Sequence, residues 1–134
     1  MKKILNIALL PFLLLTGSCS NKDNNSTPGD TAAVITIIAP VANSRYANAS
    51  TLQIRGSIDD QDILKNAKVE LRNKTSGAVL FTQTSITGNL SLYNFNWSWP
   101  VTGITVAFIG TVKITSTDQY NYTTTKEVDI FIDP

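Results

Sequence analysis

Few residues of this 134-residue chain could do chemistry, and the first is its one cysteine, Cys19. The chain has no His, which excludes His-based triads and His-ligated zinc, and a single Cys excludes a disulfide within the chain. A Cys thiolate is a good nucleophile for acyl transfer. The small residues Thr16–Ser18 directly before it allow the backbone to lie extended in a processing enzyme. We therefore expect Cys19 to be modified rather than catalytic.

The second candidate is an acidic cluster. Asp59, Asp60 and Asp62 stand together, and Asp118 is expected at the same end of the fold. Calcium prefers several oxygen ligands, and two loops could bring the four carboxylates together. The Asp-x-Asp-x-Asp-Gly spacing of a calcium loop is missing, so the alternative is a solvated turn capped by Asp59. Apart from this calcium site, no cofactor is expected.

No other residues form a catalytic pattern. Acid–base chemistry without His would need perturbed carboxylates or Lys, and no spaced Glu/Asp pair lies in a recognisable pocket motif. A Ser-x-x-Lys sequence is absent from the mature chain, and so is a Gly-rich phosphate loop. We therefore expect that the protein is not an enzyme.

The N-terminus begins with Met1–Lys3, a basic start, followed by an apolar run from Ile4 to Leu15. This run is shorter than the about 20 apolar residues that cross a membrane, and the pattern is typical of a secretory signal peptide. With Cys19 it resembles the lipobox of bacterial lipoproteins, although Thr16 stands where that family prefers Leu. The resemblance implies that residues 1–18 are removed and that Cys19 is acylated, with palmitate as one such chain.

The alternative is ordinary secretion with cleavage after Ser18, which leaves Cys19 as a free thiol. A spare thiol is a liability in an oxidising compartment, and this favours the lipoprotein. Ser20 in place of Asp after the Cys disfavours retention at the inner membrane, by the same resemblance. Ser20–Asp23 resembles a short export signal of Gram-negative surface lipoproteins. We therefore expect a lipid-anchored protein of the bacterial outer membrane, exposed at the surface.

Residues 19–33 are expected to form the lipidated Cys and a flexible tether. From residue 20 onward the segment has no large apolar side chain and is rich in Asn, Ser, Thr, Gly and Pro, so it cannot bury enough surface to fold. Asp30-Thr31-Ala32 resembles a bacterial O-glycosylation motif, which makes Thr31 a candidate for modification. Without Lys2 and Lys3, 9 basic and 10 acidic residues remain, so nucleic acid is not an expected partner.

Residues 34–134 alternate apolar and polar side chains with the period of two that is typical of half-buried strands. No long segment keeps helical spacing, and evenly spaced short strands separated by turn residues favour one β-sandwich domain. The alternating apolar positions are Leu52, Ile54 and Ile58; Ala67, Val69 and Leu71; Ile104, Val106, Phe108, Val112 and Ile114; and Val128, Ile130 and Ile132.

These segments resemble the strands of bacterial immunoglobulin-like (fibronectin type III-like) domains. Ile37–Pro40 resembles the first strand, Leu52–Asp59 and Ala67–Leu71 resemble the strands that follow, and Val112–Tyr122 resembles the last hairpin. Asn121 stands where the family usually has Gly, and Asn tolerates left-handed backbone angles. The resemblance implies an all-β, immunoglobulin-like sandwich of about seven antiparallel strands.

An aromatic stripe, Tyr93, Phe95, Trp97 and Trp99, falls on one side of a strand. It is interpreted as sandwich core rather than as a sugar-stacking platform, because so many exposed aromatic side chains would cost solubility. Leu90 and Leu92 alternate in the phase opposite to that of the aromatic stripe, which predicts a bulge or strand boundary near Leu92. Tyr46, Tyr120 and Tyr122 fall in predicted loops and are the candidate ligand contacts.

Two functions remain open. The first is a tethered binding or adhesion module that contacts a protein or a glycan through loops at one end of the sandwich, with carbohydrate binding through Trp or Tyr stacking as a variant. The second is a structural accessory or spacer subunit of an envelope complex, such as a polysaccharide-uptake assembly; it rests on fold analogy alone. Both keep the membrane as a partner through the lipid.

Overall fold

The strands of this protein are unequal in length. A computed structural model describes residues 31–134, and the predicted signal peptide and Cys19 lie outside this range. The strands are β1 (Val34–Ala39), β2 (Arg45–Ala47), β3 (Thr51–Asn73), β4 (Val79–Pro100), β5 (Phe108–Asp118) and β6 (Thr123–Asp133). Within the described range, no helix is long and apolar enough to cross a membrane. The all-β prediction is confirmed.

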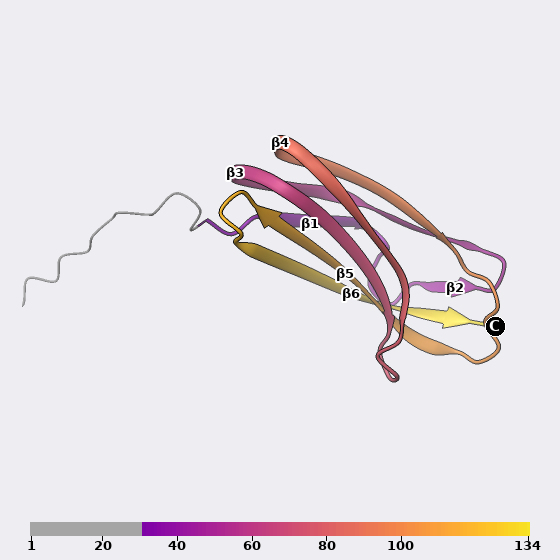
Figure 1. Ribbon diagram of the computed structural model, residues 1–134. Helices are drawn as coiled ribbons and strands as arrows, with labels where there is room; N and C mark the ends of the chain where they lie inside the picture. The colour runs from indigo at the N-terminus through magenta and orange to yellow at the C-terminus, as the bar shows by residue number, and fades with distance from the viewer. Residues whose placement is uncertain (1–30) are drawn as a thin grey trace, which may run out of the picture.

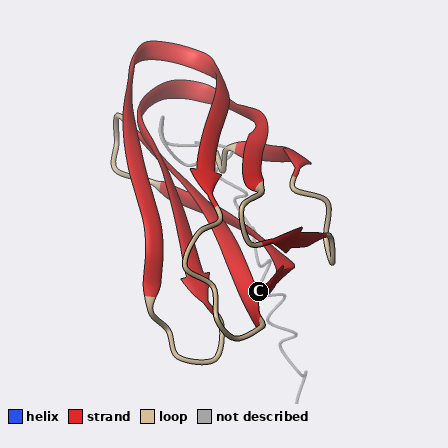
Figure 2. Ribbon diagram, turned by 90° about the vertical axis from the view of Figure 1, so that its right-hand side faces the viewer, coloured by secondary structure: helices blue, strands red, loops and turns tan. Residues whose placement is uncertain are grey.

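The two long strands, β3 and β4, each contribute to both layers of the molecule (Figure 1). The first half of β3 pairs with β1 and with the second half of β4, from Thr51↔Pro100 to Asp59↔Leu92. Its second half pairs with β5 and with the first half of β4. In Figure 2 both ribbons arch across the top, where they pass from one layer to the other. The result is a sandwich of a β1–β3–β4 layer and a β4–β3–β5–β6–β2 layer.

A register shift marks the passage between the layers. It lies between the pairs Asp59↔Leu92 and Leu64↔Leu90, so β3 has extra residues there that β4 lacks. The bulge predicted near Leu92 is therefore confirmed. We call residues 60–63 of β3 the crossover.

Two details of the predicted strands are corrected. The structure has six continuous strands rather than about seven, because the long strands are not interrupted at the bulge, and β2 pairs with β6 in parallel rather than antiparallel over three residues. Ile104 and Val106 lie in the loop before β5 and not in a strand. Val106 is 74% exposed, because no neighbouring strand gives its alternation a partner.

The core lies between the layers and consists of the side chains that alternation placed inward. Leu52, Ile54 and Ile58 of β3 are fully buried, as are Ile130 and Ile132 of β6. The aromatic stripe belongs to this core. Trp97 is 4% exposed and stacks on Phe95 with ring centroids 4.8 Å apart, while Tyr93 and Trp99 are partly buried and pack against the same cluster. The core interpretation of the stripe is confirmed for Phe95 and Trp97.

Gly56 allows β1 to approach β3 closely. A Cβ atom at this position would lie 1.9 Å from the carbonyl oxygen of Thr36 in β1 and 2.6 Å from the ring of Phe95 in β4. The contact with Thr36 is to backbone, which cannot move without breaking the β1–β3 ladder. Gly56 is therefore required by the packing of three strands.

We expect Trp97→Ala to lower the free energy of unfolding by about 3–5 kcal/mol, because it leaves a cavity against Phe95 in a closed core. Urea denaturation measures the change. Ser98→Ala, at the neighbouring exposed position of β4, is the control and should change stability by less than about 0.5 kcal/mol. A loss below about 1 kcal/mol for Trp97→Ala would contradict the buried placement of the ring.

We expect Gly56→Ala to cost at least about 2 kcal/mol, because the added methyl group meets backbone that cannot yield. Gly110→Ala is a matched control. Gly110 is also buried within a strand, but the nearest atom to its added Cβ is the flexible end of Leu71, at 3.2 Å. This variant should lose less than about 1 kcal/mol in the same urea experiment, and equal losses for the two glycines would contradict the argument.

Candidate functional site

Three segments meet at one end of the sandwich, which we call the crossover end. They are the crossover of β3, the bend of β4 around Gly88 and Asn89, and the turn between β5 and β6 (Figure 1). The Gln119 backbone N–H donates to the carbonyl of Ile63 at 2.8 Å, which fixes the turn against the crossover. The buried hydroxyl of Thr87 donates to the carbonyl of Leu64 at 2.7 Å, which fixes β4. Backbone oxygens at the bulge are therefore satisfied by neighbouring segments.

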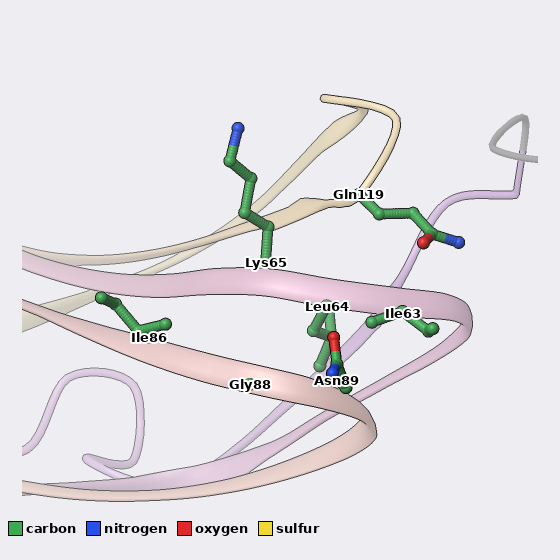
Figure 3. Close-up of a pocket in the computed structure, with 7 residues that line it drawn as sticks. All are labelled: Ile63, Leu64, Lys65, Ile86, Gly88, Asn89 and Gln119. Atoms are coloured by element: carbon green, nitrogen blue, oxygen red, sulfur yellow. The ribbon is translucent and has the colours of Figure 1, made fainter.

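A shallow pocket of about 320 Å³ opens at this end (Figure 3). Its lining residues are Ile63, Leu64, Lys65, Ile86, Gly88, Asn89 and Gln119. In Figure 3 the side chain of Lys65 points away from Leu64 and Ile86, and its ammonium donates to Asn121 Oδ1 at 2.9 Å. The part of the pocket between β3 and β4 is thus formed by aliphatic and amide groups. It contains no pair of ionisable groups that could act as acid and base.

Exposed aliphatic side chains surround this pocket. Ile86 is 87% exposed, and Ile63, Leu90 and Leu92 are also exposed. The strand that carries Ile86, Leu90 and Leu92 pairs only with β3, so one side of β4 has no neighbouring strand among the described residues. A cluster of exposed large apolar groups beside an uncovered strand edge is typical of a contact surface.

Ile86 was not identified from the sequence as a candidate contact residue. The signal that could have identified it is its isolation: it is the one aliphatic residue in the polar run Thr82–Thr87, on the same side of the strand as Thr82 and Thr84. Within this run Ile86 has no apolar neighbour on its own face of the strand, so alternation does not assign it to the core.

The predicted tyrosine contacts do not lie together. Tyr120 and Tyr122 are exposed in the turn between β5 and β6, at the crossover end, as predicted. Asn121 between them has a φ of 67°, the left-handed backbone expected of that position. Tyr46 was wrongly predicted to lie in an exposed loop. It lies in β2, paired with Ile132 at the opposite end of the sandwich, and it packs partly buried against the core.

The four predicted acidic residues are near one another but differ in exposure. Asp59 is exposed and Asp62 is half-buried, whereas Asp60 and Asp118 are buried. Burial raises the pKa of Asp60, the hydrogen bond from the Asp62 N–H lowers it, and the charges of Asp118, Asp62 and Asp59 raise it again. Among residues 31–134, no three His, Cys, Asp or Glu side chains are arranged as a metal-binding group.

The opposite end has a second shallow hollow, of about 370 Å³, lined in part by Arg45, Phe131 and Asp133. The Arg45 guanidinium lies 4.6 Å from the centre of the Phe131 ring and donates to both carboxylate oxygens of Asp133 at 3.0 and 3.1 Å. The charges of Arg45 and Asp133 therefore compensate each other, and this ion pair joins β2 to β6. This arrangement is structural, and we do not assign it as the site.

Glu70 is the most strongly perturbed carboxylate. Side-chain hydrogen bonds from Arg72 and Lys68 lower its pKa from 4.5 to about 2. All three side chains belong to alternate positions of β3, on the outer face of the larger layer, where Lys113 stands opposite Glu70. The perturbation comes from ion pairs along one strand and not from a catalytic cleft.

Thr31, the candidate glycosylation site, is half-buried at the start of the described chain. Ala33, the last residue of the predicted tether, is already buried, and its N–H donates to Thr124 Oγ1 at 3.2 Å. The chain therefore enters the sandwich at the crossover end. Modification of Thr31 stays a prediction.

No protein-family model and no curated protein matches the chain. Solved structures match it in fold. The fibronectin(III)-like modules of CbhA from Clostridium thermocellum superpose with a TM-score of 0.51 at 14% identity, over 75% of this chain and 96% of that chain. CopC from Methylosinus trichosporium OB3b gives a TM-score of 0.47 at 9% identity, over 75% and 95% of the two chains. Murine CRIg gives 0.46 at 8% identity, over 77% and 98%.

At 14% identity, the similarity to the CbhA modules shows the fold alone. It agrees with the two-layer arrangement derived above from the strand register. Residues 31–134 therefore form an immunoglobulin-like, fibronectin type III-like β-sandwich domain.

Proposed function

We propose that this chain is a non-catalytic bacterial lipoprotein, anchored in the outer membrane through acylated Cys19, whose β-sandwich is a binding module at the cell surface. The proposal is supported by the signal-like residues 1–18 and by the small residues before Cys19. More than one acyl chain on one residue gives stable anchoring, because about 0.8 kcal/mol accrues per buried methylene. The polar segment that follows then spaces the domain from the lipid.

The partner that fits the crossover end best is a protein. Ile86 is 87% exposed beside a shallow pocket, and it is the observation that carries this proposal. Aliphatic groups at an open strand edge gain most from burial against another protein, whose backbone can also pair with the edge. Stacking on a sugar needs an exposed aromatic face, and Trp97 is buried. Tyr120 and Tyr122 add amphipathic contacts at the rim.

The anchor is tested by Cys19→Ser in the full chain expressed in a Gram-negative host. We expect the variant to lose labelling by radioactive palmitate and to leave the membrane fraction, because Ser lacks the thiol that accepts the lipid. Ser18→Ala is the control and should still be labelled and membrane-bound. Persistence of Cys19→Ser in the membrane fraction, with labelling unchanged, would contradict the anchor.

The contact surface is tested by photo-crosslinking of the full chain in intact cells. A benzophenone amino acid is placed at position 86 or 92 at the crossover end, and at position 106 at the opposite end, where Val106 is also exposed. We expect one discrete adduct from positions 86 and 92 and none from 106. The adduct from position 92 should fall at least tenfold when Ile86→Asp is added, while the melting temperature stays within a few degrees.

An adduct from position 106 alone would contradict the assignment of this end. So would binding on a glycan array that Ile86→Asp leaves unchanged. A partner that co-purifies in constant ratio and crosslinks equally at all three positions would favour the structural-subunit function over the binding module.

A further inference from the structure

Asp118, at the end of β5, has one carboxylate oxygen that no other group of residues 31–134 satisfies. Its Oδ1 accepts hydrogen bonds from the backbone N–H groups of Tyr120 and Tyr122 at 2.8 and 2.7 Å, and these hold the turn between β5 and β6. Its Oδ2 is buried and has no hydrogen-bond partner in the described part of the chain, and the residue as a whole is 1% exposed. A buried anionic oxygen without a partner is strongly unfavourable, so it requires an explanation.

A second buried carboxylate, Asp60, lies close to it. Asp60 is 5% exposed in the crossover, and its Oδ1 accepts the backbone N–H of Asp62 at 3.0 Å. Burial is the largest cause that raises the pKa of Asp60, and the charge of Asp118 also raises it. The hydrogen bond from Gln119 N–H to the Ile63 carbonyl joins the two segments that carry these carboxylates. Two acidic groups are therefore held at one junction.

No lysine or arginine among the described residues forms an ion pair with these two carboxylates. Among residues 31–134, neither Asp60 nor Asp118 forms a salt bridge, whereas Glu70 has both Lys68 and Arg72. The lysines of this region donate to uncharged oxygens: Lys65 to Asn121 Oδ1 and Lys126 to the carbonyl of Ile35, at 2.9 and 2.8 Å. Two carboxylates buried together without a cation repel each other, and a bound cation offsets that repulsion.

We propose that Asp118 Oδ2 and the carboxylate of Asp60 bind a calcium ion at the junction of the crossover with the turn between β5 and β6. All available ligands are oxygens, which suits a hard cation, and His and Cys are absent from the described residues. Since no third acidic side chain of the described chain completes a cluster there, backbone carbonyls and water supply the other ligands. Such a site is of the weak extracellular kind, with a Kd of about 10⁻⁴–10⁻³ M.

This inference does not depend on the proposed protein partner. The ion would clamp the segment that carries Ile63 to the turn that carries Gln119, and both residues line the pocket. Calcium would therefore order the crossover end. Asp59, which is exposed, is not a ligand in this arrangement.

The test is the melting temperature of the full chain, purified in detergent, in EDTA and in 10 mM CaCl₂, with NaCl of equal ionic strength as the salt control. We expect calcium to raise the melting temperature of the wild type by about 5–10 °C. Asp118→Asn and Asp60→Asn should lose this rise. Asp133→Asn, at the opposite end, should keep it. Terbium bound at the site should luminesce on excitation of the nearby tyrosines and be displaced by calcium.

Asp118→Asn also separates the cation from a simple structural role. Its amide oxygen can still accept the N–H groups of Tyr120 and Tyr122, so in EDTA the variant should melt at or above the wild-type temperature. If this variant does not fold, the calcium response of Asp60→Asn and the terbium signal of the wild type decide whether a cation binds at the site. A wild type that responds to neither calcium nor terbium overturns the proposal, as does a calcium response that survives in the folded Asp variants.

Discussion

The hydrogen-bonding of β3 is the constraint on which the rest of the structure depends. This strand pairs with β1, β4 and β5, and it exchanges β1 for β5 along its length. The exchange is possible because extra residues between Asp59 and Leu64 let the strand change layers without leaving its partner β4. Gly56 permits the close approach of β1 to the first half of β3, because no side chain fits between the two strands there.

The character of the crossover end follows from this bulge. Where the regular ladder is interrupted, backbone groups must find other partners, and the Gln119 N–H and the Thr87 hydroxyl supply them. The alternation of side chains continues through this region: Asp60 is buried in phase with Ile58, and Asp118 is buried in phase with Ile114. Ile63 falls on the exposed phase of β3, so apolar groups are exposed and carboxylates are buried at the same end.

The sequence predicted those parts of the fold that depend on local alternation. The inward faces at Leu52, Ile54 and Ile58 were predictable because each strand keeps the period of two, and the change of phase at Leu90 and Leu92 predicted the bulge. Tyr46 was not predictable, because its strand has three residues and its partner, β6, lies about ninety positions away in the chain.

The acidic residues were expected to form a turn, and this expectation hid the burial of Asp60. In the structure they continue β3, where Asp60 is buried in phase with Ile58 and Asp59 falls on the exposed phase. Alternation also predicted Val106 on the inward face of a strand, but this residue lies in a loop and is exposed, because no neighbouring strand covers it. Local pattern determines a strand's faces, but long-range pairing determines whether the strand exists.

The described chain enters at the crossover end through Ala33 and finishes at the opposite end after β6 (Figure 1). A pulling force applied across these two points would run parallel to the strands. The hydrogen bonds from β1 to β3, and those from β6 to β5, would then be loaded in shear. In this geometry all the bonds of a ladder bear the force together, instead of breaking one after another. The arrangement thus favours mechanical toughness along the long axis of the domain.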